Sequence, residues 1–291
     1  MFVLAINVIL PFHKQAYHTC WDDVERRIQG DVAEPGSERD LRFNEKRSSL
    51  RGTILDIIRH RRSTHDAARG GGNFLDALLD AEDLYPTDES LVDMVLTYLI
   101  GGFHTTGYLL SWAVYFLCLN PDVAEKLHKE ITAVVGVGKL SFEKCKEMPY
   151  LDQVVNETLR CSLLAPTAAR VPTDSDIVVG GHRIPKNTPI ISALGTVIHD
   201  PDIWPEPSKF DPERFSREKT ASRHPLAFQP FGFQGKRKCP GYRFAYYEAY
   251  VYLVSIVKNF HLGLVKDQNI KYRHGLVTQF TEEVYITITS R

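Results

Sequence analysis

An apolar pattern with helical spacing runs from Thr87 to Leu119, and it constrains the fold more than any other feature of this sequence. Thr87 is the type of residue that caps a helix N-terminus, and Asn120-Pro121 follows directly after the pattern ends. At ~1.5 Å per residue, a helix over about 88–119 is roughly 48 Å long. We therefore expect one helix that crosses the whole protein.

The other expected elements are shorter and change in type along the chain. Helical spacing predicts helices at 13–29, 45–62, 121–135 and 149–163, and a short amphipathic segment at 74–79. The stretches 37–44 and 63–73 are expected to be loops. Short alternating or β-branched runs predict strands at 177–179, 183–184, 188–192 and 284–289. The expected fold class is mainly α with small β-sheets.

The composition argues against several classes of protein. The chain has 291 residues, of which 43% are hydrophobic, and a net charge of -1, so it can bury a large core and has no overall attraction for nucleic acid. Its five cysteines are widely spaced and include no Cys-x-x-Cys pair, which argues against a disulfide framework and a zinc site. The apolar segment 1–10 is well short of the ~20 residues of a membrane span, and we expect it to end a buried helix.

Cys239 stands near the end of the run 230–241, directly before a long helical pattern. We expect Pro240 to be the first helical residue, which places Cys239 at or beside the N-cap. The positive end of a helix and neighbouring cations lower the pKa of a thiol, so this cysteine is a candidate thiolate ligand of haem iron. Gly235 and Gly241 would let the backbone approach a flat ligand closely. The alternative is a buried free thiol.

This loop resembles that of the cytochrome P450 superfamily, Phe-x-x-Gly-x-Arg-x-Cys-x-Gly followed by a helix. The positions in register are Gly235, Arg237, Cys239 and Gly241. The position seven before the cysteine is Gly232, and the aromatic residue is displaced to Phe233. That departure is similar to family 20 of the superfamily, an animal group with no settled substrate, as are 243–246 and 276–278. The resemblance implies haem b, with its iron ligated axially by Cys239 and with Gly235 and Phe233 beside it.

The resemblance also implies a domain organisation. Animal members are usually longer and carry an N-terminal membrane anchor, so residues 1–291 are expected to form a single P450 domain that lacks its N-terminal part. It would comprise a helical region at 1–165, a β-containing and cysteine-loop region at about 166–241, and a terminal helix at about 240–260 followed by strands to 291. The family implies a place at the cytoplasmic face of the endoplasmic reticulum membrane, although this chain has no segment long enough to span it.

The middle of the long helix contains Gly101-Gly102-Phe103-His104-Thr105-Thr106, although each glycine costs a helix about 1 kcal/mol relative to alanine. The cost is explained if the helix lies against a flat ligand at Gly102 and opens locally, so that Thr105 offers its hydroxyl to bound oxygen. P450s carry an acid before this threonine, and together the two deliver protons. His104 replaces the acid, and an imidazole can still relay a proton. The alternative is close helix packing, with His104 in the core.

Two sets of charged residues match the superfamily. Glu157 and Arg160 share a helical face, and the resemblance implies a buried network with Arg214 that shapes the cysteine loop. Arg170 and Arg237 match arginines that P450s direct at the haem propionates, since a guanidinium suits a carboxylate. Taken alone, each of these two would be an ordinary surface charge.

The basic run Lys236-Arg237-Lys238 matches the face on which P450s dock an electron-donor flavoprotein, and a solvated loop is an equal alternative. The function that the resemblance implies is a haem-thiolate monooxygenase. It would oxidise a small hydrophobic substrate with dioxygen and with electrons from NADPH-cytochrome P450 reductase, and Thr105 and His104 would handle protons. Two alternatives remain: a truncated, non-catalytic haem-binding or interaction protein, and a P450-type isomerase or dehydratase.

Overall fold

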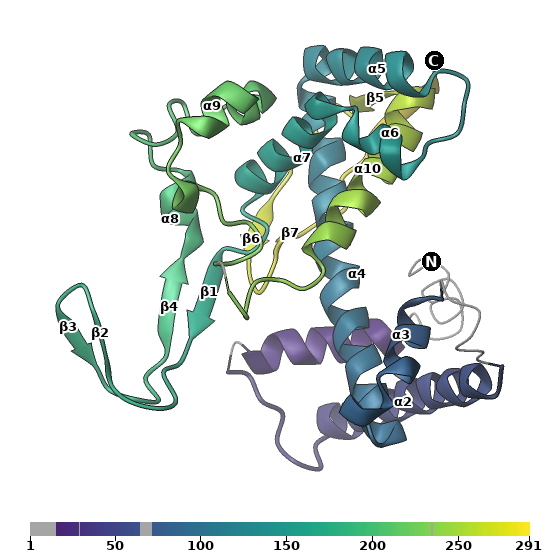
Figure 1. Ribbon diagram of the computed structural model, residues 1–291, viewed down its shortest axis with the longest axis vertical. Coiled ribbons are helices and arrows are strands. Elements are labelled where there is room, and N and C mark those ends of the chain that lie inside the picture. Colours follow the sequence, from purple (N-terminus) through teal and green to yellow (C-terminus); the bar gives the residue numbers. More distant parts are fainter. Residues whose placement is uncertain (1–15, 29, 65–71, 234) are drawn as a thin grey trace. The chain divides into compact units, whose positions relative to one another are not determined.

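The computed structural model describes residues 16–28, 30–64, 72–233 and 235–291. The chain forms two compact units, residues 1–103 and 104–291, and the long helix α4 (Asp88–Leu119) contributes its first half to one and its second half to the other (Figure 1). The expected fold class is confirmed, because helices predominate and the strands form small two-stranded antiparallel sheets. No helix within the described ranges is long and apolar enough to cross a membrane. The predictions for 1–10 and for most of 63–73 fall outside the described residues.

The first unit is helical. It contains a helix over 16–28, then α2 (Glu38–Thr64), α3 (Phe74–Asp80), the 3-10 turn η2 (Glu82–Leu84) and the first half of α4. Its core is built from apolar side chains of these helices, among them Ile54, Ile58 and Leu91. Asn73 caps α3 by accepting from the backbone N–H groups of Leu75 and Asp76. The predicted helices at 13–29, 45–62 and 74–79 are therefore found in the described part of the unit.

The loop expected at 37–44 is wrong, because α2 begins at Glu38. Ser37 accepts a hydrogen bond from the backbone N–H of Asp40 at 3.3 Å, which caps the first turn. Glu38 and Asp40 place negative charge at the positive end of the helix, and Phe43 is buried on its inner face. These contacts extend the helix well before the apolar spacing becomes regular.

The bounds predicted for α4 are confirmed. Its first turn is closed by reciprocal hydrogen bonds between Thr87 and Ser90, each backbone N–H donating to the other side-chain oxygen. The helix continues through Gly101–Thr106, so the expected local opening of its backbone is not found. The cost of a few glycines is small for a helix of 32 residues that buries side chains on both sides of them, such as Leu99 and Leu109.

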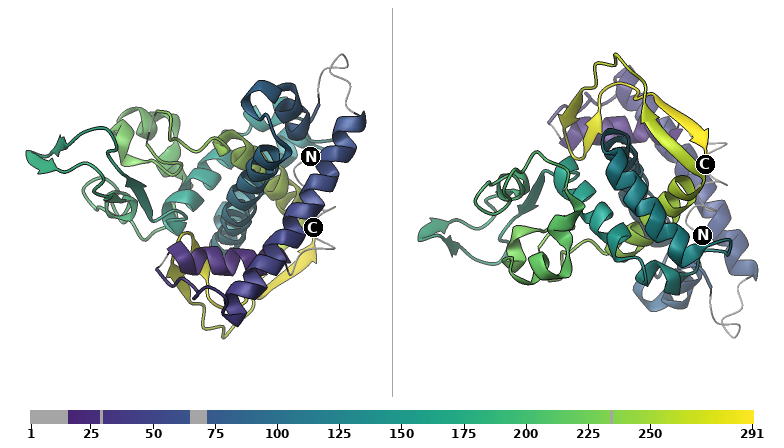
Figure 2. Two further views of the ribbon diagram at one scale, coloured as in Figure 1. Left: turned by 90° about the horizontal axis from the view of Figure 1, so that it is seen from below. Right: turned by 90° about the horizontal axis from the view of Figure 1, so that it is seen from above.

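The second unit combines helices with hairpins (Figures 1 and 2). Its helices after α4 are α5 (Pro121–Val135), α6 (Phe142–Lys146), α7 (Pro149–Ser162), α8 (Leu194–Ile198), η3 (Pro212–Phe215), α9 (Arg217–Ala221), η4 (Pro225–Ala227) and α10 (Tyr242–Asn259). Its antiparallel pairs are β1 (Thr167–Arg170) with β4 (Ile190–Ala193), β2 (Ile177–Val179) with β3 (His182–Ile184), β5 (Phe260–Leu264) with β8 (Ile286–Ser290), and β6 (Tyr272–His274) with β7 (Thr278–Phe280). The predictions for α5, α7, β2, β3, β4 and β8 are confirmed to within a few residues. Strands were also expected between the terminal helix and residue 291, but the bounds of β5, β6 and β7 were not predicted, and neither was β1.

Side chains from distant segments tie the second unit together. The indole N–H of Trp112, on α4, donates to the backbone oxygen of Thr278 at 3.1 Å, and its ring lies 4.1 Å from that of Phe280. The hydroxyl of Thr278 in turn donates to the backbone oxygen of Leu163 at 2.5 Å. The β6–β7 hairpin thereby joins α4 to the end of α7, the helix that carries Glu157 and Arg160.

Candidate functional site

Cys239 lies in a loop between η4 and α10 that is shaped by backbone hydrogen bonds and glycines. Its N–H donates to the carbonyl oxygen of Phe231 at 2.9 Å, and its side chain is half-buried. Gly232 and Gly235 have φ angles of 80° and 107°, which L side chains rarely adopt. A Cβ added to either glycine would meet no atom within 4 Å, so both glycines are required by backbone conformation and not by crowding.

The start of α10 differs from the prediction. Tyr242 is its first residue and Gly241 is its N-cap, since the Gly241 carbonyl accepts the N–H of Ala245 at 2.9 Å. Pro240 is therefore not the first helical residue, because a turn at Pro240-Gly241 comes before the first helical bond. Cys239 lies two residues before the N-cap, so the thiol precedes the helix. A Cβ added to Gly241 would lie 4.0 Å from the sulfur of Cys239.

Arg170 and Arg237 come from separate segments and meet beside this loop. Arg170 is the last residue of β1, and its Nη2 group donates to the backbone oxygen of Arg237 at 3.5 Å. Both side chains are exposed. Two guanidinium groups are thus available near the cysteine loop to pair with carboxylates.

These residues fit a haem group. Haem is flat, carries two carboxylates, and has an iron that takes a protein ligand on one face. The loop offers a half-buried thiol at Cys239, and the Arg170–Arg237 contact brings a cation from β1 to its backbone. Gly235 has open space where a side chain would project. This set of donors matches the charge and the metal of such a ligand.

The predicted residues of α4 fall in both compact units. Gly102 belongs to the first unit and is half-buried, whereas His104 and Thr105 belong to the second. His104 is 7% exposed, and its ring stacks on that of Tyr108 with 5.9 Å between centroids. Thr105 is half-buried, one residue further along the helix. A buried imidazole and a hydroxyl are therefore adjacent on α4.

A buried ion network joins α7 to the segment that precedes the cysteine loop, and the resemblance had implied its three members. Glu157 receives Nε of Arg160 at 2.7 Å and Nη2 at 2.9 Å, and Nε of Arg214 lies 3.4 Å from its Oε1. Glu157 and Arg160 are fully buried, and the backbone N–H of Asp211 adds a bond to Glu157 at 2.8 Å. Arg214 donates to the backbone oxygens of Pro205 and Glu206 at 2.6 and 2.8 Å. The network thus fixes the segment that precedes the cysteine loop.

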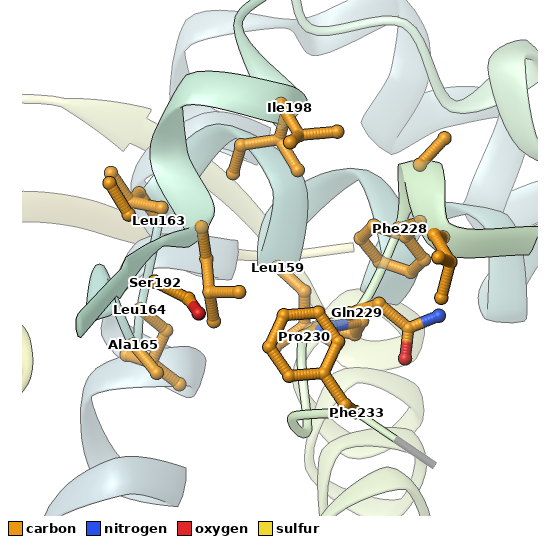
Figure 3. A pocket seen from close by; sticks show the side chains of 15 residues that line it. Leu159, Leu163, Leu164, Ala165, Ser192, Ile198, Phe228, Gln229, Pro230 and Phe233 are labelled. Carbon is orange, nitrogen blue, oxygen red and sulfur yellow. The ribbon is translucent and has the colours of Figure 1, made fainter. Parts of the chain in front are cut away.

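An apolar cavity of about 110 Å³ lies beside the network, and Phe233 forms part of its wall (Figure 3). The end of α7 contributes Leu159 and Leu163, and α8 contributes Ile198. The sequence does not predict this cavity, because most of its lining residues are ordinary apolar residues from separate segments. Phe233, expected beside the cofactor, lines this cavity.

Comparisons with known proteins agree with the geometry. The sequence model of the family described as "Cytochrome P450" matches residues 37–285. The chain is 31% identical over 288 residues to cytochrome P450 20A1 of Mus musculus, covering 97% of this chain and 59% of that protein. It is 37% identical over 185 residues to cytochrome P450 3A31 of Mesocricetus auratus, covering 63% of this chain and 36% of that protein. It is 32% identical over 255 residues to the bifunctional cytochrome P450/NADPH--P450 reductase ALT2 of Alternaria alternata, covering 86% of this chain and 22% of that protein. The chain thus spans about three fifths of the length of the mouse relative.

Proposed function

Because the chain belongs to the cytochrome P450 family, we propose that it binds haem b through Cys239 and acts as a haem-thiolate monooxygenase on a small hydrophobic substrate. The observation that carries the proposal is the cysteine loop itself. Glycines in left-handed conformations turn the loop, Cys239 is half-buried in it, and Arg170 reaches its backbone. When bound, the haem supplies one-electron and dioxygen chemistry that no side chain provides.

The residues of the loop hold and orient the cofactor. Cys239 would ligate the haem iron as a thiolate, since the thiolate is the form that binds metals. Arg170 and Arg237 pair with the two carboxylates through charge-assisted hydrogen bonds. Gly235 leaves room for a flat ligand, and the same role for Gly102 on α4 remains a prediction from the sequence. The network of Glu157, Arg160 and Arg214 keeps the preceding segment in place.

His104 and Thr105 handle protons on α4. The threonine hydroxyl can donate and accept hydrogen bonds, and the imidazole can take up and release a proton. Both residues belong to the same compact unit as Cys239, which supports a proton relay that would serve the bound cofactor. His104 is buried, so bulk water does not compete freely for its proton.

Electrons come from a reductase, for which NADPH-cytochrome P450 reductase is the proposed donor. Lys236 and Arg237 are exposed next to Cys239, and a basic surface steers an acidic partner. The Alternaria relative is named as a P450 joined to an NADPH-P450 reductase, which supports the same kind of donor here. The family supports a place at the cytoplasmic face of the endoplasmic reticulum membrane.

The test is the carbon-monoxide spectrum of the ferrous protein after reconstitution with haem. We expect the red-shifted band of a thiolate adduct. A band typical of a histidine adduct would contradict ligation by Cys239. If the protein takes up no haem, the alternative of a non-catalytic interaction protein replaces the proposal.

A second candidate is an isomerase or dehydratase that rearranges an already oxygenated substrate. The observation in its favour is His104, which stands where other members carry an acid, since such a reaction needs no external proton relay. Turnover measurements separate the two functions. Consumption of NADPH and dioxygen supports the monooxygenase, and turnover without either supports the isomerase or dehydratase.

A further inference from the structure

Trp204 is fully buried and receives two guanidinium groups over its indole ring. The guanidinium carbon of Arg223 lies 3.9 Å from the ring centroid, and that of Arg160 lies 5.3 Å away. Within the described part of the chain, the indole N–H has no hydrogen-bond acceptor. Trp204 is therefore held through the faces of its ring, and those faces attract cations.

Arg223 brings a third guanidinium to the region of the buried carboxylate Glu157, which Arg160 and Arg214 already contact. Burial lowers the pKa of the Arg223 guanidinium, and the charge of Glu157 partly opposes this shift. Two groups stabilise the positive charge of Arg223. They are the ring of Trp204 and the backbone oxygen of Arg214, which accepts a hydrogen bond from Nη2 of Arg223 at 2.6 Å. A cation kept in such a place needs a structural reason.

The segment that follows Arg223 leads to Cys239, and several of its described residues form hydrogen bonds within it. The bonds to carbonyl oxygens, each with its donor first, are Ala227 N–H to His224 (2.9 Å), Gln229 Nε2 to Pro225 (2.7 Å), Gly232 N–H to Gln229 (3.1 Å) and Cys239 N–H to Phe231 (2.9 Å). Phe228 also packs on Phe215, with 4.7 Å between ring centroids. A constraint at Arg223 is therefore passed on to the loop that carries the thiol.

We propose that Arg223 is a positioning residue for Cys239. By stacking on Trp204 and bonding to Arg214, it fixes the upstream end of the segment that presents the thiol. The planar guanidinium suits this task, because it can lie flat on a ring and donate in its own plane at once. The proposal rests on the proposed haem-thiolate function, for which the position of the sulfur matters.

Hydrogen exchange in the protein without haem tests the positioning directly. In Arg223→Met, the peptides that contain the amides of Ala227, Gly232 and Cys239 should exchange about tenfold faster than in the wild type, since a desolvated cation–ring contact is lost. Arg217→Met, which alters an exposed arginine on α9, should leave these rates unchanged. Unchanged rates in Arg223→Met would overturn the proposal.

Arg223→Lys keeps the test decisive if the methionine variant unfolds. A lysine retains the charge without the planar fork, so faster exchange confined to the same peptides supports the proposal, and wild-type rates overturn it. After reconstitution, Arg223→Met should also increase the share of ferrous carbon-monoxide adduct without thiolate ligation. If the wild type binds no haem, the proposed function fails, and the exchange rates still decide the role of Arg223.

Discussion

The Nη2 group of Arg170 lies 3.5 Å from the backbone oxygen of Arg237, across 67 positions of the chain. Arg170 ends β1, and Arg237 stands two residues before Cys239. The antiparallel pairing of β1 with β4, which sets Arg170 opposite Ile190, holds this strand end in place. The contact therefore places the guanidinium of Arg170, at the end of β1, beside the loop that carries Cys239.

Replacing Arg170 with alanine should weaken haem binding. A hydrogen bond to a charged group contributes about 1.5–3 kcal/mol, so the affinity should fall by about tenfold or more. Absorbance titration of the protein with haem measures the change. Arg183→Ala, at an exposed arginine of β3, is the matched control and should bind like the wild type. Equal affinity of Arg170→Ala and the wild type would show that this guanidinium does not contact the cofactor.

Replacing Glu157 with glutamine should destabilise the protein strongly. The variant keeps the shape of the side chain but leaves Arg160 and Arg214 buried without a carboxylate, which costs about 3–5 kcal/mol. Denaturant unfolding measures the loss, and Glu147→Gln, at an exposed glutamate after α6, should stay close to the wild type. A loss below about 1 kcal/mol, the range of a surface pair, would mean that the backbone oxygens alone satisfy both arginines.

The hydrogen bonds to Asp23 predict that the folded protein loses stability in acid. Burial raises the pKa of its carboxyl, but hydrogen bonds from Arg27 and Arg39 outweigh burial and hold the pKa below its ordinary value of 3.8. The unfolded chain therefore binds the proton more readily than the folded protein. The stability that this carboxylate contributes is complete above pH 3.8 and is lost as the pH falls through the lowered pKa.

Asp23→Asn should accordingly be less stable than the wild type at neutral pH, and the difference should shrink in acid. Urea unfolding over a series of pH values provides the measurement. Asp22→Asn, at the exposed neighbouring position, serves as the control and should show no such trend. A difference between Asp23→Asn and the wild type that stays constant down to strongly acidic pH would refute the assignment.

His104→Gln tests the proposed proton relay. Glutamine keeps hydrogen-bonding groups but cannot carry a proton, so the rate of coupled oxidation should fall about 100-fold. Haem uptake should not change. The measurement is the rate of product formation coupled to NADPH oxidation, with any substrate that the wild type turns over, and Ser111→Ala on the exposed side of α4 is the control. Wild-type coupling in His104→Gln would place His104 among ordinary core residues.

Local signals explain what could be predicted from the sequence. The bounds of α4 follow from the capping residue Thr87 and the spacing after it, both of which act within a few residues. The start of α2 was missed because it depends on the burial of Phe43, a tertiary contact. The start of α10 was placed too early because the turn at Pro240-Gly241 is determined by the folded loop.

The candidate site also combines features that local motifs predict with features that depend on tertiary contacts. Cys239 and the pairing of Glu157 with Arg160 follow from motifs within short stretches. The stack of Arg223 on Trp204 was not predicted, because it joins residues 19 positions apart whose contact exists only once the intervening turns have formed. Nothing in the local pattern of either residue distinguishes it from an ordinary surface arginine or core tryptophan.

The central claim is that Cys239 ligates haem iron, and alkylation of the cysteines with and without haem tests it most directly. Peptide-resolved mass spectrometry measures each thiol separately. Cys239 is half-buried and should be alkylated in the haem-free protein, whereas burial raises the pKa of Cys118 to about 11 and should slow its reaction. Haem should protect Cys239 and leave Cys118 unchanged. Equal alkylation of Cys239 with and without bound haem, or protection of another cysteine in its place, would contradict the claim.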